Sequence, residues 1–548
     1  MIPIINSTME LKDCRDQWTY NEEYRCWCLE DVLYTAVADV PKFQRLSIFA
    51  PEACMRKDGT PTEESKSIPI VFENNAAGYM QMPHTWLGGP RCYAEQYLQH
   101  GLVYVTCGCR GRESRNAQGE LVGKAPISLI DLKTALRFLR HNQHVLPGDF
   151  DRIISVGYSA GGAMSALLGV TGDNPRYIPY LEKNGAFLDE SDAVFAAQIY
   201  CPIIDLEHAD YAYEWMFGAD PENQASHAGP AGMMNPFERA LSAKLSNEYP
   251  AYLNSLNLRH PLTDEPLTLA PDGRSGSFFQ FFMQQIDASA TRFLSHLTAC
   301  SPEDYLSGNY EYEAEAPQQG AMHHAGPGVH IENAQESEPR GLGELLLRPP
   351  KGVPYQKKSP PMMTMHGTDK RSWLSWDGKG AHISSLDDFI LRHCRRIKGC
   401  PAFDKLSMDS AENHAFGTSE QSYAHFNPSL APLIMELRER FPDEAAQYGK
   451  DYAVASDPQM EKRVFLLNPM NFIGTEESSN QAKFYRIRVG AVDSDTSFSI
   501  AMALALKLKN VGYPVDYSLV WDQPHCEADI PGEILAWIDD ICASDGRK

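Results

Sequence analysis

A serine in a glycine-flanked turn is the first group in this sequence that could do chemistry. Ser159 stands in Gly157-Tyr-Ser-Ala-Gly161, after an apolar run that predicts a strand and before a small-residue run that predicts a helix. A serine hydroxyl becomes a useful nucleophile where such a turn exposes it beside a base and at a positive helix N-terminus. Glycine at both flanks removes side chains that would collide. We predict a catalytic nucleophile; the alternative is an ordinary glycine-rich turn.

A serine nucleophile in such a turn requires an acid and then a histidine later in the chain. His525 follows one predicted strand near the C-terminus, and Asp493 and Asp495 follow the strand before it. The loops at one edge of a parallel sheet converge, so these groups can meet the serine. We expect His525 to take the serine proton and the acid to orient the imidazole. Asp493, in a Gly-x-x-Asp turn that starts at Gly490, is the preferred acid, and Asp495 is the alternative.

A third carboxylate, Asp369 in Met-His-Gly-Thr-Asp, is a weaker candidate for the acid. The segment that follows it lacks the Val-, Ile- or Tyr-rich strand that would carry a histidine to the edge of the sheet. We therefore expect Asp369 to lie outside the catalytic set.

Two backbone N–H groups should stabilise the oxyanion that forms when the serine attacks a carbonyl. The first is expected from Ala160, at the start of the helix that follows the serine. The second is expected from the small-residue loop 73–79, where Ala76 or Ala77 is the predicted donor and Ala77 is preferred. A plain turn is the alternative for this loop.

The elements that must position these groups alternate between strand and helix. Near-continuous apolar runs predict parallel strands that are covered on both faces. The predicted strands are Phe43–Phe49, Ile68–Phe72, Leu102–Thr106, Ile153–Gly157, Val194–Ile204, Tyr485–Val489 and Val515–Trp521. Helices are predicted at Pro126–Asn142, Ser497–Asn510 and Ile530–Cys542. We predict an α/β fold with a mainly parallel sheet and helices on both faces.

The alternation stops between residues 206 and 482. This stretch is richer in Trp, Pro, His and Met, and its segments 273–276 and 313–360 resemble loops. We predict an α/β core formed by residues 1–205 and 483–548, interrupted by an insertion at 206–482. An insertion at the carboxyl end of a core strand stands over the ligand-binding edge of the sheet, so we expect it to act as a lid.

Composition narrows the possible partners and the compartment. The chain has 548 residues, enough for two or more domains, and a net charge of −23, which argues against nucleic acid or an anionic membrane as partner. No apolar run approaches the length of a membrane span, and the start of the chain lacks the pattern of a signal peptide. Thirteen cysteines, an odd number without metal-ligand spacing, favour a reduced, cytoplasmic location. Secretion with removal of a signal peptide is the alternative.

Two segments carry residues that metals favour. Cys26 and Cys28 flank a tryptophan in a predicted strand and would share one face, but no second pair of Cys or His has matching spacing. The histidine-rich segment 322–330 could bind metal opportunistically. We predict no functional metal and no cofactor.

At this point the sequence resembles a known family, the bacterial tannases. These are α/β-hydrolase esterases with a large lid insertion. The resemblance extends over most of the chain and is most specific at residues 157–162, 485–497 and 520–525. It implies hydrolysis of the ester and depside bonds of galloyl compounds, with release of gallic acid. It also implies that the partners of the protein are small-molecule polyphenols.

The resemblance also assigns individual residues. The separation between the family's catalytic Asp and His matches Asp493 and His525. A second Asp that helps to bind the trihydroxylated ring matches Asp495. A Lys and a Glu from the lid side match Lys398 and Glu412 by their spacing. Without the resemblance, these last two would be read as solvated surface charges.

One departure separates the chain from the fungal tannases and their feruloyl-esterase relatives. Those proteins carry a cysteine before the serine and another after the histidine, joined in a disulfide. Here Cys526 follows His525, but Tyr158 precedes Ser159. The resemblance is therefore to the bacterial type, and Cys526 is expected to be a reduced thiol near the site.

Three alternatives stay open at this point. A hydroxycinnamoyl (feruloyl) esterase or a prolyl-peptidase-like hydrolase would use the same triad on another substrate. A catalytically silent α/β-hydrolase fold could serve as a binding protein. The sequence leaves the oligomeric state undetermined.

Overall fold

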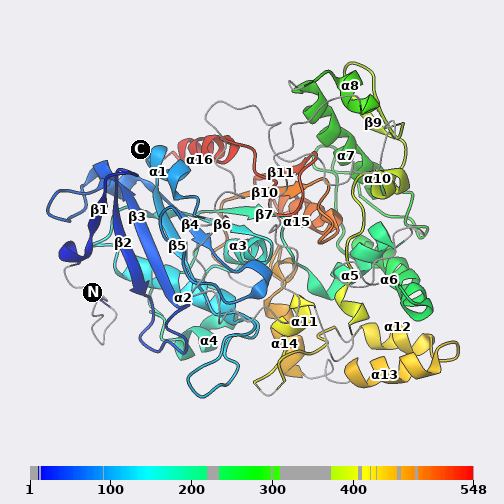
Figure 1. The fold of residues 1–548 in the computed structure, drawn as a ribbon, viewed down its shortest axis with the longest axis horizontal. Coiled ribbons are helices and arrows are strands. Elements are labelled where there is room, and N and C mark those ends of the chain that lie inside the picture. The colour runs from blue at the N-terminus through cyan, green and yellow to red at the C-terminus, as the bar shows by residue number, and fades with distance from the viewer. Residues whose placement is uncertain are drawn as a thin grey trace.

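The computed structural model describes residues 10–546, apart from 12–13, 90–91, 219–233, 298–299, 309–371, 405–409, 420, 428, 453–457 and 476–478. Nine strands form one sheet, in the order β1-β2-β3-β5-β4-β6-β7-β10-β11 (Figure 1). Their bounds are β1 (Thr19–Asn21), β2 (Cys26–Leu33), β3 (Arg45–Pro51), β4 (Pro69–Asn74), β5 (Val103–Cys107), β6 (Asp149–Tyr158), β7 (Ala196–Tyr200), β10 (Phe484–Gly490) and β11 (Val515–Val520).

The sheet is antiparallel at its N-terminal edge and parallel elsewhere. β1, β2, β3 and β5 pair antiparallel, and every pair from β5 to β11 is parallel. β10 and β11, which come from the end of the chain, continue the sheet directly beside β7. Their carboxyl ends therefore lie on the same edge as the carboxyl end of β6. The predicted α/β architecture is confirmed.

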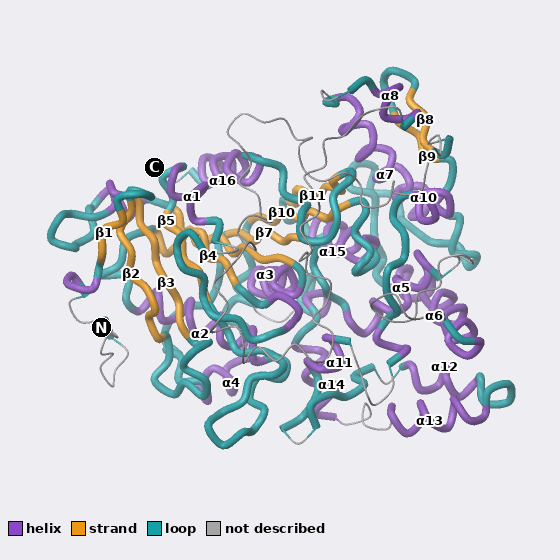
Figure 2. Tube along the Cα trace, viewed as in Figure 1, coloured by secondary structure: helices purple, strands orange, loops and turns teal. Residues whose placement is uncertain are grey.

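Helices cover both faces of the sheet, as Figure 2 shows. In β4, Ile70 and Phe72 belong to one apolar cluster and Val71 to another, and all three side chains are buried. The first cluster includes residues of α2 (Ile127–His141), α3 (Ala160–Val170) and α15 (Phe498–Asn510), and the second includes residues of α1 (Ala94–Gln99) and α16 (Glu533–Ser544). Burial on both faces explains why these strands read as continuous apolar runs.

β7 is shorter than the predicted strand Val194–Ile204. It ends at Tyr200, because Cys201 has a positive φ of 37° and the chain leaves the sheet there. Asp205, with φ 54°, then precedes a helix that begins at Leu206. The apolar residues Ile203 and Ile204 beyond Tyr200 are buried although they lie outside the strand, so hydrophobicity alone overestimated the length of the strand.

Helices dominate the described residues between β7 and β10. They are α5 (Leu206–Phe217), α6 (Pro236–Ser255), α7 (Ser277–Ser295), α8 (Pro302–Ser307), α10 (Leu386–Arg392), α11 (Ala411–Ala415), α12 (Leu430–Glu436), α13 (Pro442–Tyr452) and α14 (Pro458–Leu466), together with a hairpin of β8 (Leu374–Trp376) and β9 (Ala381–Ile383). Most of them gather around the β11 end of the sheet (Figure 1). None of the helices in the described ranges combines the length and apolar character that crossing a bilayer needs.

Hydrogen bonds join this region to the core. Ser289 of α7 donates to the backbone oxygen of Leu519 in β11 at 3.0 Å, and Tyr249 of α6 donates to the Ser499 hydroxyl of α15 at 2.8 Å. These contacts are buried, so the helices are held against β11 and α15 at the edge of the sheet that carries the predicted catalytic loops.

Candidate active site

Ser159 occupies a sharp turn between β6 and α3. Its backbone has φ 60° and ψ −124°, a conformation that L-residues rarely adopt. A Cβ added to Gly157 would lie 2.1 Å from the carbonyl oxygen of Gly161, and one added to Gly161 would lie 2.8 Å from Asn74 Oδ1. The two glycines of the motif are therefore required by close approach, and the turn holds the serine in a strained conformation that is typical of functional sites.

The structure brings together the three residues predicted as a triad. His525 Nε2 lies 2.8 Å from Ser159 Oγ, and His525 Nδ1 lies 2.8 Å from Asp493 Oδ2. Asp493 is fully buried, while the His525 side chain keeps 19% of its surface exposed. Asp495, the alternative acid, is farther away, with 3.7 Å between its Oδ2 and His525 Nδ1. The geometry favours Asp493 as the group that orients the imidazole.

The carboxylates also set the charge of the histidine. Burial on its own lowers the pKa of His525, but the Asp493 carboxylate, together with Cys201 and Asp495, outweighs it and holds the pKa well above the ordinary value. The same attraction stabilises the imidazolium that forms when the histidine takes a proton from Ser159.

The two segments that carry the predicted oxyanion donors lie close to each other. Ala160 is the first residue of α3, and helix-start N–H groups have no partner within their own helix. The loop after β4 forms the short helix η4 (Ala77–Tyr79), preceded by the buried Ala76. A Cβ on Gly161 would lie 3.7 Å from the Ala76 nitrogen, so this loop approaches the start of α3. The roles of Ala160 and Ala77 stay predictions.

Two of the three residues assigned to ring recognition are in contact, and the third lies close to them. Lys398 Nζ lies 3.3 Å from Asp495 Oδ1, and their side chains are only 13% and 11% exposed. Glu412, on α11, is partly buried and near enough to act on the lysine electrostatically. Burial lowers the pKa of Lys398, but Asp495 and Glu412 raise it further, so the pKa lies above the ordinary value and the ammonium stays charged. A charged lysine thus pairs with Asp495, which itself lies 3.7 Å from His525 Nδ1.

The family model BD-FAE, of an α/β-hydrolase type, matches residues 96–227, which contain the Ser159 turn. Three solved structures are similar to almost the whole chain. A tannin acyl hydrolase from Lactobacillus plantarum is 28% identical, with a TM-score of 0.72 over 98% of this chain and 99% of its own. A tannase from Fusobacterium nucleatum is 27% identical, with a TM-score of 0.72 over 98% and 100%. A tannin acyl hydrolase in complex with ethyl gallate is 28% identical, with a TM-score of 0.69 over 94% of each chain.

The chain resembles the tannases. This confirms the resemblance seen in the sequence, the α/β-hydrolase type of the fold and the prediction of an enzyme of the carboxylic ester hydrolase class. Among curated proteins, none matches the sequence.

The loop that carries Lys398 is held by a buried ion pair that the sequence did not reveal. Arg396 donates to both carboxylate oxygens of Glu214 at 2.8 Å, and both side chains are fully buried. The same guanidinium donates through Nε to the backbone oxygen of Lys398 at 2.9 Å. The hydroxyl of Tyr213 lies 3.2 Å from that oxygen and 3.1 Å from the backbone oxygen of Ser494. α5 therefore connects the Lys398 loop to the loop of the predicted acid, Asp493.

Replacing Glu214 by glutamine is expected to lower the free energy of unfolding by about 3–5 kcal/mol, because it leaves the Arg396 guanidinium buried without a compensating charge. Urea denaturation measures the change. The matched control is Glu436→Gln, which removes a carboxylate that pairs with Lys244 but is 60% exposed. The control should cost at most about 1 kcal/mol. Equal losses in the two variants would contradict the role of the buried pair.

Of the weaker candidates for a metal site or for the catalytic acid, the structure describes only the pair Cys26 and Cys28. Cys26 and Cys28 are buried with 3.8 Å between their sulfurs. Within the described ranges, neither belongs to a group of three or more possible metal ligands. Asp369 and the histidine-rich segment 322–330 lie outside the described residues.

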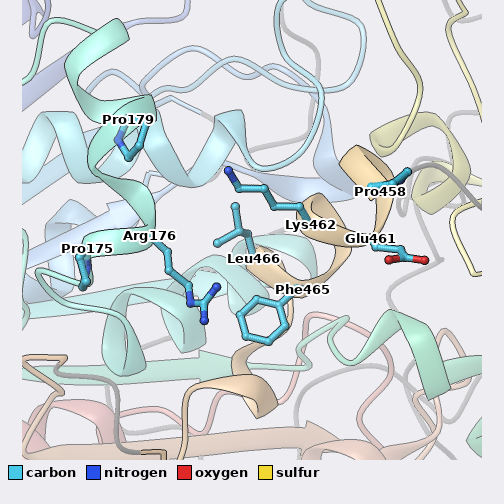
Figure 3. Close-up of a pocket in the computed structure, with 8 residues that line it drawn as sticks. All are labelled: Pro175, Arg176, Pro179, Pro458, Glu461, Lys462, Phe465 and Leu466. Atoms are coloured by element: carbon cyan, nitrogen blue, oxygen red, sulfur yellow. The ribbon is translucent and has the colours of Figure 1, made fainter.

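A surface groove elsewhere on the molecule contains none of the predicted site residues. It lies between α14 and the segment formed by η5 (Pro175–Tyr177) and α4 (Ile178–Lys183), as Figure 3 shows. Arg176 stacks on Phe465 at this groove, 4.8 Å from the ring centre. The groove is separate from the triad and carries none of the chemistry described above.

Proposed function

We propose that the chain is a serine esterase that hydrolyses the galloyl ester and depside bonds of hydrolysable tannins and releases gallic acid. The observation that carries the proposal is the unbroken hydrogen-bonded series from Ser159 through His525 to Asp493. It lies in a chain that is similar to tannin acyl hydrolases over almost its whole length, one of them in complex with ethyl gallate.

The proposed reaction is acyl transfer through a covalent intermediate. Ser159 attacks the galloyl carbonyl carbon while His525 takes its proton. The backbone N–H groups of Ala160 and Ala77 donate to the oxyanion of the tetrahedral intermediate. The intermediate collapses when His525 returns the proton to the leaving alcohol, and a galloyl ester remains on Ser159. His525 then takes a proton from water, and the water oxygen attacks the acyl carbon. The bond to Ser159 Oγ breaks, His525 returns the proton to that oxygen, and gallic acid leaves.

Ring recognition is proposed for Lys398, Glu412 and Asp495. Three adjacent phenol hydroxyls offer donors, and the two carboxylates accept short, strong hydrogen bonds from them. The ammonium of Lys398 donates to a ring oxygen. The link from Lys398 to Asp495 and from Asp495 to His525 supports a ring bound next to the reacting carbonyl.

We also propose the domain division expected from the sequence, with residues 1–205 and 483–548 as the catalytic core and 206–482 as the lid. The serine, histidine and aspartates come from the core, whereas Lys398 and Glu412 come from the lid. The core would then supply the catalytic triad and Asp495, and the lid the other two residues proposed for ring recognition.

Methyl gallate is expected to be hydrolysed with a kcat/KM about 10³-fold or more above that of methyl benzoate, because a site built to pair hydroxyls leaves its buried charges unpaired with an unhydroxylated ring. Replacing Glu412 by glutamine should lower the ratio of the two kcat/KM values, mainly by raising KM for methyl gallate. Glu439→Gln, at an exposed position of the same insertion, is the control and should leave the ratio unchanged.

Methyl ferulate and an acyl-proline amide, assayed in parallel, separate the tannase proposal from its hydrolase alternatives. Equal rates on gallate and benzoate esters would contradict ring recognition, and a higher rate on ferulate would favour a feruloyl esterase. A protein that hydrolyses none of the four and takes up no fluorophosphonate would be a silent binding fold.

A further inference from the structure

A pair of cysteines lies directly against the proposed catalytic histidine. We infer that Cys201, Cys526 and His525 form a binding site for a soft divalent cation such as Cd²⁺ or Zn²⁺, and that an ion bound there stops ester hydrolysis. The binding stands on the geometry alone, whereas the inhibition rests on the proposed function of His525.

The spacing of the ligand atoms fits a tetrahedral ion. The two sulfurs are 3.7 Å apart, and the sulfurs and a ring nitrogen of His525 all lie within 4.8 Å of one another. Two thiolates bound to Zn²⁺ at about 2.3 Å in tetrahedral geometry lie about 3.7–3.8 Å apart, and the imidazole nitrogen binds at about 2.0–2.1 Å. The cysteine sulfurs are thus already at the separation that the ion requires.

The backbone holds the two cysteines in place. Cys201 follows the last residue of β7, and Cys526 is the next residue after His525. Both have a positive φ, 37° and 67°, and the N–H of Cys526 donates to the sulfur of Cys201 at 3.2 Å. Cys201 is fully buried and Cys526 is partly exposed, so an ion reaches the pair from the side of Cys526.

Metal binding would release the thiol protons and occupy one ring nitrogen of His525. Each thiol releases its proton to solvent, and the two thiolates neutralise the charge of the ion. The imidazole binds through a ring nitrogen, and a water molecule completes the four-coordinate shell. In the free protein, Nε2 faces Ser159 and Nδ1 faces Asp493. Whichever nitrogen binds the metal, one of these hydrogen bonds is lost and the serine loses its working base.

The ligand set also selects the kind of ion. Thiolates and imidazole favour Zn²⁺, Cd²⁺ and similar soft ions over Mg²⁺ and Ca²⁺, which prefer oxygen ligands. In the described part of the chain, one other group of three possible ligands exists, formed by Asp493, Asp495 and His525. That group lacks sulfur, so variants of the cysteines distinguish the two.

The test is a titration of metal-free protein with Cd²⁺, followed by the short-ultraviolet absorption of Cd–thiolate bonds and, in the same samples, by hydrolysis of methyl gallate. The variants are Cys526→Ser and Cys201→Ser. The matched control is the double variant Cys26→Ser and Cys28→Ser, which removes another close pair of sulfurs, one that belongs to no group of three possible ligands among the described residues. Because Cys201 is buried and its variant could misfold, Cys526→Ser decides the result if Cys201→Ser is unstable.

The wild-type chain and the Cys26/Cys28 control should show thiolate absorption at one Cd²⁺ per chain and lose at least about 10²-fold in hydrolysis, the minimum typical for removal of a general base. Cys526→Ser should lose the absorption and resist inhibition.

Absence of the absorption in the wild type, or its persistence in Cys526→Ser, would overturn the site. Full hydrolysis by Cd²⁺-saturated protein would overturn the role of His525 as a ligand. If the metal-free protein hydrolyses no ester, the proposed function fails, and the absorption still tests the site.

Discussion

Replacing Ser159 by alanine is expected to lower kcat for methyl gallate by about 10⁶-fold, down to the rate that substrate binding and the oxyanion donors sustain alone. Alanine keeps the size of the residue but has no oxygen to form the acyl intermediate. The Ser159 hydroxyl is the only oxygen that the structure places at hydrogen-bonding distance from His525 Nε2 among the described residues. A steady-state assay of gallate release measures the loss, and KM should change little.

Ser165→Ala is the matched control for this variant. Ser165 lies on the same helix, α3, but its hydroxyl contacts Ser155 and Asn74 inside the core, away from His525. The control should keep catalysis and should still take up a fluorophosphonate, which Ser159→Ala should not. Residual hydrolysis in Ser159→Ala near the rate of the control would show that another nucleophile does the chemistry.

The second large effect is expected from Asp493→Asn, with a fall in kcat of about 10⁴-fold. The amide can donate a hydrogen bond to Nδ1 and so stabilises the tautomer that has its proton on Nε2, facing Ser159, where it cannot accept the serine proton. The variant also removes the main charge that raises the pKa of His525. Hydrolysis needs the neutral imidazole, so kcat/KM should fall as the pH drops through the pKa of His525. In the wild type this fall should occur at a pH above the ordinary pKa of histidine, and in the variant it should move to lower pH.

Asp495→Asn separates the two carboxylates. Asp495 lies 3.7 Å from His525 Nδ1 and 3.3 Å from Lys398 Nζ, so its loss should act mainly on KM for hydroxylated esters. Asp495 also contributes to the raised pKa of His525. The acid-side fall of kcat/KM should therefore move to lower pH in Asp495→Asn as well, but by less than in Asp493→Asn. A larger fall in kcat for Asp495→Asn than for Asp493→Asn would exchange their proposed roles.

The sequence predicted the core and the triad because both depend on local patterns. Apolar runs marked the buried strands, and the glycines around Ser159 marked the turn. The chain order of acid and base then identified Asp493 and His525 at the ends of β10 and β11. The strand boundaries were less accurate. The strand predicted at Val194–Ile204 was too long, since buried residues after a strand look the same as residues within it.

The rest of the site depends on contacts between distant segments that leave no local pattern. Lys398 lies in a loop and Glu412 on a five-residue helix, so only the family resemblance singled them out. The buried pair of Glu214 and Arg396 joins residues 182 positions apart and was not predicted from the sequence. Cys526 was noticed for its place after the histidine, whereas Cys201 comes beside it only through the pairing of β7 with β10.

The most direct test of the proposed mechanism is to quench the protein with acid during turnover of methyl gallate, digest it and examine the peptide that contains Ser159 by mass spectrometry. The mechanism predicts a galloyl group on Ser159, absent in Ser159→Ala and in protein incubated with methyl benzoate. Gallate release without any acylated serine, or with the galloyl group on another residue, would contradict it.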